Sequence, residues 1–380
     1  MHSEEMTKMD VDGTTGIHFE EDIITEILGR LPVKSLFRFK CVIRSWMTLI
    51  SKPYFVKKHH NHSKNNQNSQ KICLLTEKLS SFYQYDPSLA LASLSSVQLF
   101  EDVQQVDWPC TGNVKSCKIY CCCDGLALMG VSKYNYFLNM RLWLWNPSTR
   151  DSIVLPRTRF SHGIDFTCGL GYDSTSNDYK IFKLNGDRSH NEILVLKSGS
   201  WRKIDKHTAG IYPVWRSTMD SPAFLHDAFH WVCSLKKSVV SFNISNEVYA
   251  ELPMPDVRFV ISDSNFILYG ISVLGGMLCV YSTHAHKDKY NFNLWVMKDY
   301  GVKESWNKLF KIPSTDLNPI SPKYWFSDGE VLLHCIHLVH KHSVFKTSKE
   351  SSGFWPQSDS QRFVNGLVYT ESLISPKSLA

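Results

Sequence analysis

Five cysteines lie close together in the first third of the chain and have the side chains that bind transition metals. Cys121, Cys122 and Cys123 are consecutive, and Cys110 and Cys117 precede them. Thiolate sites for zinc generally use ligand pairs spaced as CxxC, and this spacing is absent here. Neighbouring residues on a strand also point to opposite faces. We therefore interpret these cysteines as small core residues of a strand, not as metal ligands.

A second group of potential metal ligands lies between residues 334 and 342. On a strand, alternate residues share a face, so only two ligands at a time would converge from this segment. No second cluster is visible that would complete a tetrahedral set. We expect the edge of a β-hairpin here, and no metal. The residues in question are His334, Cys335, His337, His340 and His342.

Patterns typical of catalytic and cofactor-binding sites are also absent. The chain has no GxSxG nucleophile elbow, no HExxH zinc motif, no GxxxxGK phosphate loop and no GxGxxG dinucleotide fingerprint. Gly169-Leu170-Gly171 is only a fragment of the last motif, and a turn-rich segment follows it where a helix would be needed. We predict no catalytic residues, no cofactor and no enzyme activity.

Charge is distributed unevenly at the N-terminal end. Residues 1–26 contain eight acidic residues and one lysine, whereas residues 27–76 contain ten Lys or Arg and no Asp or Glu. This separation of acidic and basic residues suggests a charged partner. It is equally compatible with a solvated face that binds nothing. Nucleic acid is the main rival partner, but the aromatic residues Phe37, Phe39 and Trp46 have the spacing of a core and would not be free to stack on bases. We therefore predict a protein partner and no nucleic acid.

Composition places the 380-residue chain among globular proteins, with 43% hydrophobic and 21% charged residues. An aromatic content of 13% favours pleated sheet. The first residues lack the apolar run of a secretory signal. The longest uncharged stretch, residues 266–281, is shorter than the roughly 20 residues of a spanning helix. We expect no membrane partner, a cytoplasmic or nuclear location (or both), and reduced cysteines.

The N-terminal region has the apolar periodicity of short helices. After a leader at 1–17 that we expect to be disordered, three apolar stripes with helical spacing indicate three helices within residues 18–56. Such a unit is below the roughly 40 residues at which a domain usually folds unaided. We therefore interpret it as an interaction module that needs a partner or the rest of the chain. The stripes are Phe19, Ile23, Ile27; a segment at 33–39 preceded by Pro32; and Val42, Trp46, Leu49, Ile50.

Residues 57–70, KKHHNHSKNNQNSQ, are polar throughout and are predicted to be a linker. A flexible linker of this composition would let the helical unit and the remainder of the chain act separately. Its histidines are interpreted as solvated residues of the linker, not as metal ligands.

From residue 71 to 380 the pattern is one of short strands and tight turns. Four turn signals, each opening an apolar strand, begin near residues 124, 226, 274 and 328. Gly169-Leu170-Gly171-Tyr172 falls between the first two, so the spacings are about 45–57 residues. Such spacings are typical of propeller blades, which predicts antiparallel sheets arranged in a ring. Residues 365–369 are strand-like, and we expect them to pair with an early strand and close that ring. A β-sandwich or two stacked sheets is the structural alternative.

Several segments together resemble a known family, the plant F-box proteins with a C-terminal F-box-associated domain, a class that includes kelch-like and S-locus F-box proteins. The resemblance covers roughly residues 19–375. The segments that carry it are residues 21–41 with Arg44-Ser45-Trp46, the stretch WNPSTR at 145–150, residues 169–173, residues 295–301 with Ser305-Trp306, and residues 369–373.

The chain departs from the family pattern at three places. Phe19-Glu20 stands where the F-box usually begins with Leu-Pro, Ile43 stands where the family often has Cys, and twin glycines of a kelch blade occur only at Gly275-Gly276. Phe19 retains an apolar anchor, so we expect weakened docking and not lost docking. The fold class that the resemblance implies is α+β multidomain: a small three-helix F-box and an all-β, propeller-like domain.

The resemblance implies the substrate-recognition subunit of an SCF-type (Skp-cullin-F-box) ubiquitin ligase. The F-box would dock on a Skp-type adaptor, which links to cullin and RING subunits, and the β domain would hold a protein substrate of unknown identity. Two alternatives stay open: a protein-binding β domain whose degenerate F-box no longer docks, and an S-locus-type factor. Expected adaptor contacts are Phe19, Ile23, Ile27, Leu28, Leu31, Pro32, Leu36, Cys41, Trp46 and Ile50; weak substrate candidates are Trp215, Arg216, Trp325 and Phe326.

Overall fold

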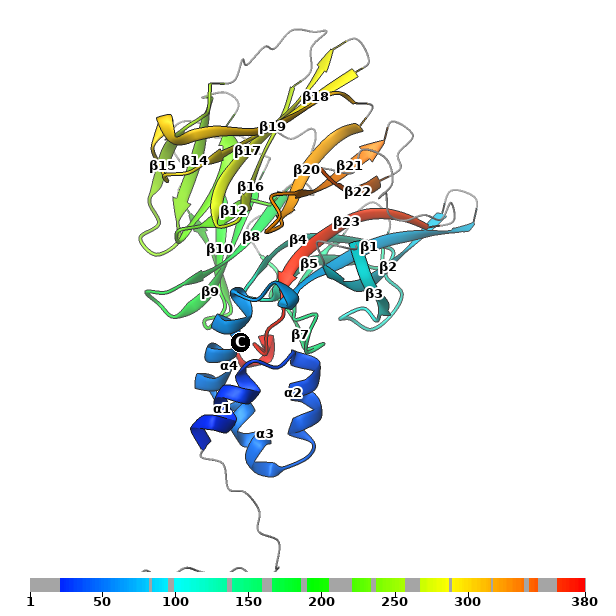
Figure 1. Ribbon diagram of the computed structural model, residues 1–380, viewed down its shortest axis with the longest axis vertical. Helices are drawn as coiled ribbons and strands as arrows, with labels where there is room; N and C mark the ends of the chain where they lie inside the picture. The colour runs from blue at the N-terminus through cyan, green and yellow to red at the C-terminus, as the bar shows by residue number, and fades with distance from the viewer. Residues whose placement is uncertain are drawn as a thin grey trace, which may run out of the picture.

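The computed structural model describes residues 21–379, apart from 82–83, 95–98, 135–138, 159–165, 186–189, 205–220, 234–236, 257–266, 287–288, 316, 338–341 and 348–360. A small helical unit lies beneath a large domain of β-sheets (Figure 1). The fold class expected from the sequence is confirmed in these two parts. The predicted leader at 1–17 lies outside the described residues.

The helical unit contains four α-helices, not the three that were predicted. They are α1 (Glu21–Gly29), α2 (Val33–Lys40), α3 (Arg44–Ser51) and α4 (Pro53–Lys64). In α1, Glu21 and Asp22 occupy the first turn, where the helix dipole favours negative charge. No helix in the described part of the chain is both long and apolar enough to cross a membrane.

The fourth helix corrects the predicted linker at 57–70. Residues 57–64 are helical, a short 3-10 turn covers Gln67–Ser69, and the first strand begins at Gln70. Helix α3 ends at Ser51, and Pro53 then starts α4 at the first helical position, where a missing N–H costs nothing. The polar composition of α4 was misleading because three of its polar residues, His59, His60 and Ser63, are buried.

The β domain consists of five antiparallel sheets, four of them with four strands each. Each four-stranded sheet is a meander in which consecutive strands pair, which is the arrangement of a propeller blade. The four sheets are β4 (Ser116–Cys123), β5 (Leu126–Ser132), β6 (Arg141–Trp145), β7 (Ser152–Val154); β8 (Phe166–Asp173), β9 (Asp178–Asn185), β10 (Asn191–Val195), β11 (Ser200–Ile204); β12 (Ala223–Leu225), β13 (Ala228–Cys233), β14 (Ser238–Asn243), β15 (Tyr249–Pro253); and β16 (Ile267–Leu274), β17 (Met277–His286), β18 (Lys289–Met297), β19 (Trp306–Thr315).

The fifth sheet joins the two ends of the β domain. Strand β23 pairs with β1 over a long register, for example Cys73 with Leu367 and Lys71 with Tyr369. The predicted closure of the ring by residues 365–369 is therefore confirmed. Its seven strands follow the order β20 (Leu317–Trp325), β21 (Val331–His337), β22 (His342–Lys346), β23 (Gln361–Thr370), β1 (Gln70–Ser81), β2 (Gln84–Leu94), β3 (Leu99–Val106).

Two-residue turns connect the first two strands of several sheets. Asp124-Gly125 joins β4 to β5, and both residues have positive φ, as a type I′ hairpin turn requires. The same geometry occurs at His226-Asp227 and at Gly275-Gly276. These are the turns that the sequence marked near residues 124, 226 and 274.

Buried apolar clusters lie where neighbouring sheets pack together. Trp145 and Tyr369 share one cluster between the β4–β7 sheet and the closing sheet. Phe182 and Phe242 stack in another, between the β8–β11 and β12–β15 sheets. Further clusters join the β4–β7 sheet to β8–β11, the β12–β15 sheet to β16–β19, and β16–β19 to β20–β21. Contiguous burial of this kind holds the sheets in a ring, not in a sandwich.

Candidate functional site: an apolar helical surface mounted on the propeller

Exposed apolar side chains are concentrated on the helical unit. Of the thirteen large hydrophobic residues that are exposed in the described part of the chain, seven lie between residues 23 and 54. The propeller, with several times as many residues, carries the other six. A gathering of this kind marks a surface that a partner covers. We call it the apolar helical surface; it comprises Ile23, Ile27, Phe37, Val42, Ile43, Met47 and Tyr54.

Helical spacing explains which side chains reach this surface. Ile23 and Ile27 are four residues apart and share one face of α1, and they are 46% and 53% exposed. Leu28, one position further along the helix, turns inward and is 3% exposed. In α2 the inward residues are Val33 and Leu36. Each helix thus divides its apolar residues between a small internal core and the outer surface.

The structure separates the predicted adaptor contacts into two sets. Ile23, Ile27, Pro32 and Cys41 are exposed, and Leu31 and Trp46 are half-buried. Their role as contacts stays a prediction. Leu28, Leu36 and Ile50 are buried in the core of the helical unit itself, so they support the surface from below and do not belong to it. Phe19 lies outside the described residues.

Two of the weak substrate candidates pack against buried clusters of the propeller. Trp325 ends strand β20 and packs against a buried cluster, and Phe326 is only 6% exposed in a neighbouring one. Both contribute to packing between strands, and their role as substrate contacts stays a prediction. Trp215 and Arg216 lie outside the described residues.

Cys117 and Cys121 to Cys123 lie on β4, and His334, Cys335 and His337 lie on β21. No group of three or more His, Cys, Asp or Glu that could hold a metal occurs among the described residues. Burial raises the pKa of the Cys121 thiol to about 12, so it is protonated at neutral pH. His334 and Cys335 are buried on β21, which pairs with β20 and β22. The expected hairpin is present, because β21 pairs with β22 up to Ile336 and His342, but β21 is an inner strand and not an edge.

Helix α4 attaches the helical unit to the propeller through a buried carboxylate. Asp124, in the β4–β5 turn, contacts the His60 ring at 2.9 Å and the Lys64 ammonium at 2.8 Å. The Tyr179 hydroxyl donates to its other oxygen at 3.0 Å. Burial alone would raise the pKa of Asp124, but the hydrogen bonds from His60 and Lys64 outweigh it and hold this pKa well below its usual range.

The C-terminal segment 371–379 forms a second attachment, which we call the strap. Leu373 inserts into the core of the helical unit beside Leu28, Leu36 and Phe55, and is 7% exposed. Figure 1 shows this segment, in red, between α4 and the lower edge of the propeller. The core of the helical unit is therefore completed by a residue that lies more than 300 positions further along the chain.

Asn146 of the WNPSTR stretch holds the strap. Its fully buried amide donates to the Ser372 carbonyl at 3.0 Å, to the Ser372 hydroxyl at 3.2 Å and to the Ile374 carbonyl at 2.8 Å. Its oxygen accepts from the N–H groups of Ser148 and Thr149, which fixes the turn that carries it. The sequence singled out WNPSTR only as a family segment; an Asn directly after a buried strand was the one available sign of this role.

These two attachments correct the expectation of independently acting units. A flexible linker would leave the helical unit free to reorient, whereas α4 and the strap bury polar and apolar contacts on both sides of the junction. The apolar helical surface therefore has a fixed position on the propeller.

Comparison with known proteins agrees with this architecture. Residues 77–369 match the model of the F-box associated beta propeller domain, and residues 19–58 match the F-box domain. The chain belongs to the F-box proteins with an F-box-associated propeller. The F-box match spans α1 to α3 and the first half of α4, and so contains the whole apolar helical surface.

Curated relatives come from Arabidopsis thaliana. The chain is 26% identical to F-box/kelch-repeat protein At3g23880 over 373 residues, which is 94% of this chain and 96% of the relative. It is 29% identical to F-box protein At3g07870 and 27% identical to F-box protein CPR1, in each case covering 77% of this chain and 72% of the relative. The similarity therefore extends over the F-box and the propeller together.

The strap predicts that the F-box is not stable without it. Leu373→Ala should lower the free energy of unfolding by about 3 kcal/mol, as for other buried leucines. Hydrogen exchange should show faster exchange in α2 and α3 than in β17. Lys377→Ala, which removes only an exposed ion pair with Asp151, is the matched control and should cost less than about 1 kcal/mol. Equal exchange in α2 for both variants would contradict the proposed shared core.

Asp124 predicts an acid-sensitive junction. Its folded-state pKa lies below the unfolded value of about 4, so its stabilising contribution is complete at neutral pH and declines as the pH falls through and below 4. The stability difference between wild type and Asp124→Asn, measured by denaturant unfolding, should be large at pH 7 and shrink in acid. Asp256→Asn, at a fully exposed carboxylate, should show no such trend. A difference independent of pH would refute this assignment.

Proposed function

We propose that this protein is the substrate-recognition subunit of an SCF-type E3 ubiquitin ligase. The F-box docks a Skp-type adaptor, which connects to cullin and RING subunits, and the propeller binds a protein substrate for ubiquitination. The observation that supports this most strongly is the apolar helical surface, because it coincides with the segment that matches the F-box domain. The chain supplies binding and positioning, and the ligase partners supply the chemistry.

The charge on α2 and at the start of α3 favours an acidic region on the partner, whereas α1 carries Glu21, Asp22 and Glu26. Lys34, Arg38 and Lys40 lie on α2, Arg44 begins α3, and residues 27–76 contain no acidic residue. An apolar centre with a charged rim is the usual composition of a specific protein interface. Opposite charge on the adaptor would raise the association rate and fix the orientation of docking.

The fixed junction gives the propeller a definite role in the ligase. Transfer of ubiquitin requires a substrate lysine near a charged E2, and holding two reactants in a defined geometry is itself a large kinetic advantage. A substrate bound to a propeller that is fixed on the F-box is held at a constant place relative to the adaptor. We therefore assign α4, Asn146 and the strap a positioning role in this function, and we propose a cytoplasmic or nuclear site of action.

Adaptor docking is tested by charging the surface without touching the core. The double substitution Ile27→Glu and Met47→Glu should weaken binding of a purified Skp-type adaptor at least tenfold, because it replaces two exposed apolar side chains of this surface with carboxylates. Both side chains are about half exposed, so the melting temperature should not change. Val248→Glu, at a 56% exposed site on the propeller, is the control. Unchanged adaptor affinity in the double variant would show that this is not the docking surface.

Substrate capture is tested with the same double variant in cells. Because the propeller is untouched, this variant should bind the substrates of the wild-type protein, identified by proximity labelling, while failing to ubiquitinate them. Its overexpression should lengthen their half-lives, and overexpression of the Val248→Glu control should not. Point substitutions are preferable to deletion of the F-box, since deletion would also uncover Leu373 and Asp124. Unaltered substrate half-lives in cells that express the double variant would contradict the receptor function.

A further inference from the structure

A cavity lies at the junction between the F-box and the propeller, beside the turn that begins at Asn146. Its volume is about 500 Å³, which is within the usual range of sites for small molecules. Its lining combines Lys34 and Phe37 of α2 with residues of β1, β2 and β3 and with the turn 147–150. We call it the junction cavity, because both parts of the molecule contribute to it.

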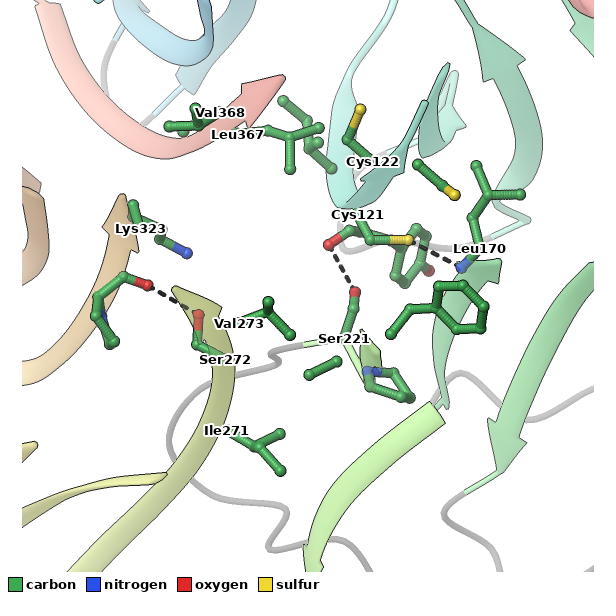
Figure 2. Close-up of a pocket in the computed structure, with 18 of the residues that line it drawn as sticks. Cys121, Cys122, Leu170, Ser221, Ile271, Ser272, Val273, Lys323, Leu367 and Val368 are labelled. Atoms are coloured by element: carbon green, nitrogen blue, oxygen red, sulfur yellow. Dashed lines mark hydrogen bonds between the residues drawn. The ribbon is translucent and has the colours of Figure 1, made fainter. Parts of the chain in front are cut away.

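A second cavity, where strands β4, β16, β20 and β23 converge, has polar groups that are already paired. Figure 2 shows Ser221, whose hydroxyl donates to the Tyr120 carbonyl at 2.7 Å, and Ser272, whose hydroxyl donates to the Pro322 carbonyl at 3.4 Å. Lys323 also lines this cavity and has an interaction partner of its own. These groups do not require a ligand, and the junction cavity differs in this respect.

Glu371, at the start of the strap, lines the junction cavity with a half-buried side chain. Its backbone N–H donates to the Ser69 carbonyl at 2.9 Å, but its carboxylate makes no hydrogen bond or ion pair with the residues that the structure describes. Burial raises the pKa of Glu371, and the charge of Lys71 offsets this only in part. The Lys71 ammonium donates to the Ser93 hydroxyl at 2.9 Å. Since withdrawing a carboxylate from water without a donor is costly, an incoming cation would be stabilised at Glu371.

Two further groups of the cavity lie on the turn after β6. The Ser148 hydroxyl is buried and has no hydrogen-bond partner in the described structure. The Arg150 side chain is exposed, and within the described part of the chain its guanidinium makes no hydrogen bond or ion pair. The turn itself is fixed, because the Ser148 N–H donates to the Asn146 side-chain oxygen at 2.8 Å and the Arg150 N–H donates to the Asn146 carbonyl at 2.9 Å. The cavity thus presents a hydroxyl and a cation on a rigid support.

The charges of the lining have both signs, which restricts the class of ligand. A polyanion such as phosphate would meet carboxylates, and a multivalent cation would meet ammonium and guanidinium groups, so neither complements the whole lining. Apolar side chains, among them Leu91, Pro147 and Tyr369, also line the cavity and suit an apolar body. The charged lining residues are Lys34, Lys71, Asp102, Arg150 and Glu371.

We propose that the junction cavity binds an apolar zwitterion of amino-acid or dipeptide size, with its ammonium group on Glu371 and its carboxylate on Arg150. Charge-assisted contacts at two ends of one molecule give both affinity and orientation. Two sources share this chemistry, a free amino acid and a short peptide. Because α2 and the turn 147–150 belong to different parts of the molecule, the bound zwitterion adds contacts across the junction and stabilises it.

The test uses the full-length protein and defined probes. Binding of L-leucine and of the dipeptide leucyl-leucine is measured by calorimetry, together with both compounds blocked at the amino group by acetylation or at the carboxyl group by amidation. At least one zwitterion should bind, and blocking either of its ends should weaken binding at least tenfold, because one charged contact is lost. Its binding should also raise the melting temperature.

Two substitutions separate the two contacts. Glu371→Gln should remove the preference for a free over an acetylated amino group and retain the preference for a free carboxylate, and Arg150→Gln should do the reverse. Each substitution removes a charge without removing a side-chain hydrogen bond of the described structure, so neither should lower the melting temperature of the free protein. Glu304→Gln and Lys298→Gln, at exposed positions outside the cavity, are the matched controls and should retain both preferences.

Each outcome decides the proposal. Tighter binding of leucyl-leucine than of leucine identifies a short peptide as the source, and the reverse identifies a free amino acid; both support the site. Equal binding of free and blocked probes, both preferences retained in both cavity variants, or no binding of any probe overturns it. Adaptor affinity is measured on the same preparations. Failure of the cavity proposal with intact adaptor docking leaves the ligase function standing.

Discussion

The insertion of Leu373 into the helical core is the contact on which the arrangement of the molecule depends. Four helices of at most twelve residues enclose too little apolar surface to be stable alone. The missing part of their core comes from the strap, which follows directly after β23, the strand that closes the ring against β1. One continuous segment, Gln361 to Leu379, therefore closes the propeller and then completes the F-box. The stability of the helices that carry the apolar helical surface therefore depends on closure of the propeller by β23.

Local patterns in the sequence were sufficient for the parts of the fold that local interactions determine. Apolar residues at helical spacing located α1, α2 and α3. Residue pairs such as Asp124-Gly125 located the hairpin turns, because glycine and aspartate tolerate the positive φ that these turns have. Pairing of residues 365–369 with an early strand was also predictable, because an unpaired terminal strand in a ring of sheets needs a partner. The same helical periodicity placed Ile23 and Ile27, two members of the apolar helical surface, on one face of α1.

Contacts between distant segments were not predictable from local pattern, and they account for each correction. Residues 57–64 look like a linker because they are polar. His60 and Lys64, however, pair with Asp124, which lies about 60 positions further along the chain. Leu36 was expected to contact the adaptor because of the family resemblance, which does not show that its side chain is buried in the core of the helical unit. Its role as a contact stays a prediction. Trp325 was proposed as a weak substrate candidate, and the sequence alone did not show that it packs beside Gly275.

The apolar helical surface consists of exposed side chains on short helices, so binding must order those side chains, and a large complementary partner surface is needed to offset that cost. A broad surface of this kind is suited to holding a permanent subunit. The junction at Asp124 and Asn146 fixes this surface relative to the propeller. A substrate held on the propeller would therefore be presented to the adaptor side in a constant orientation.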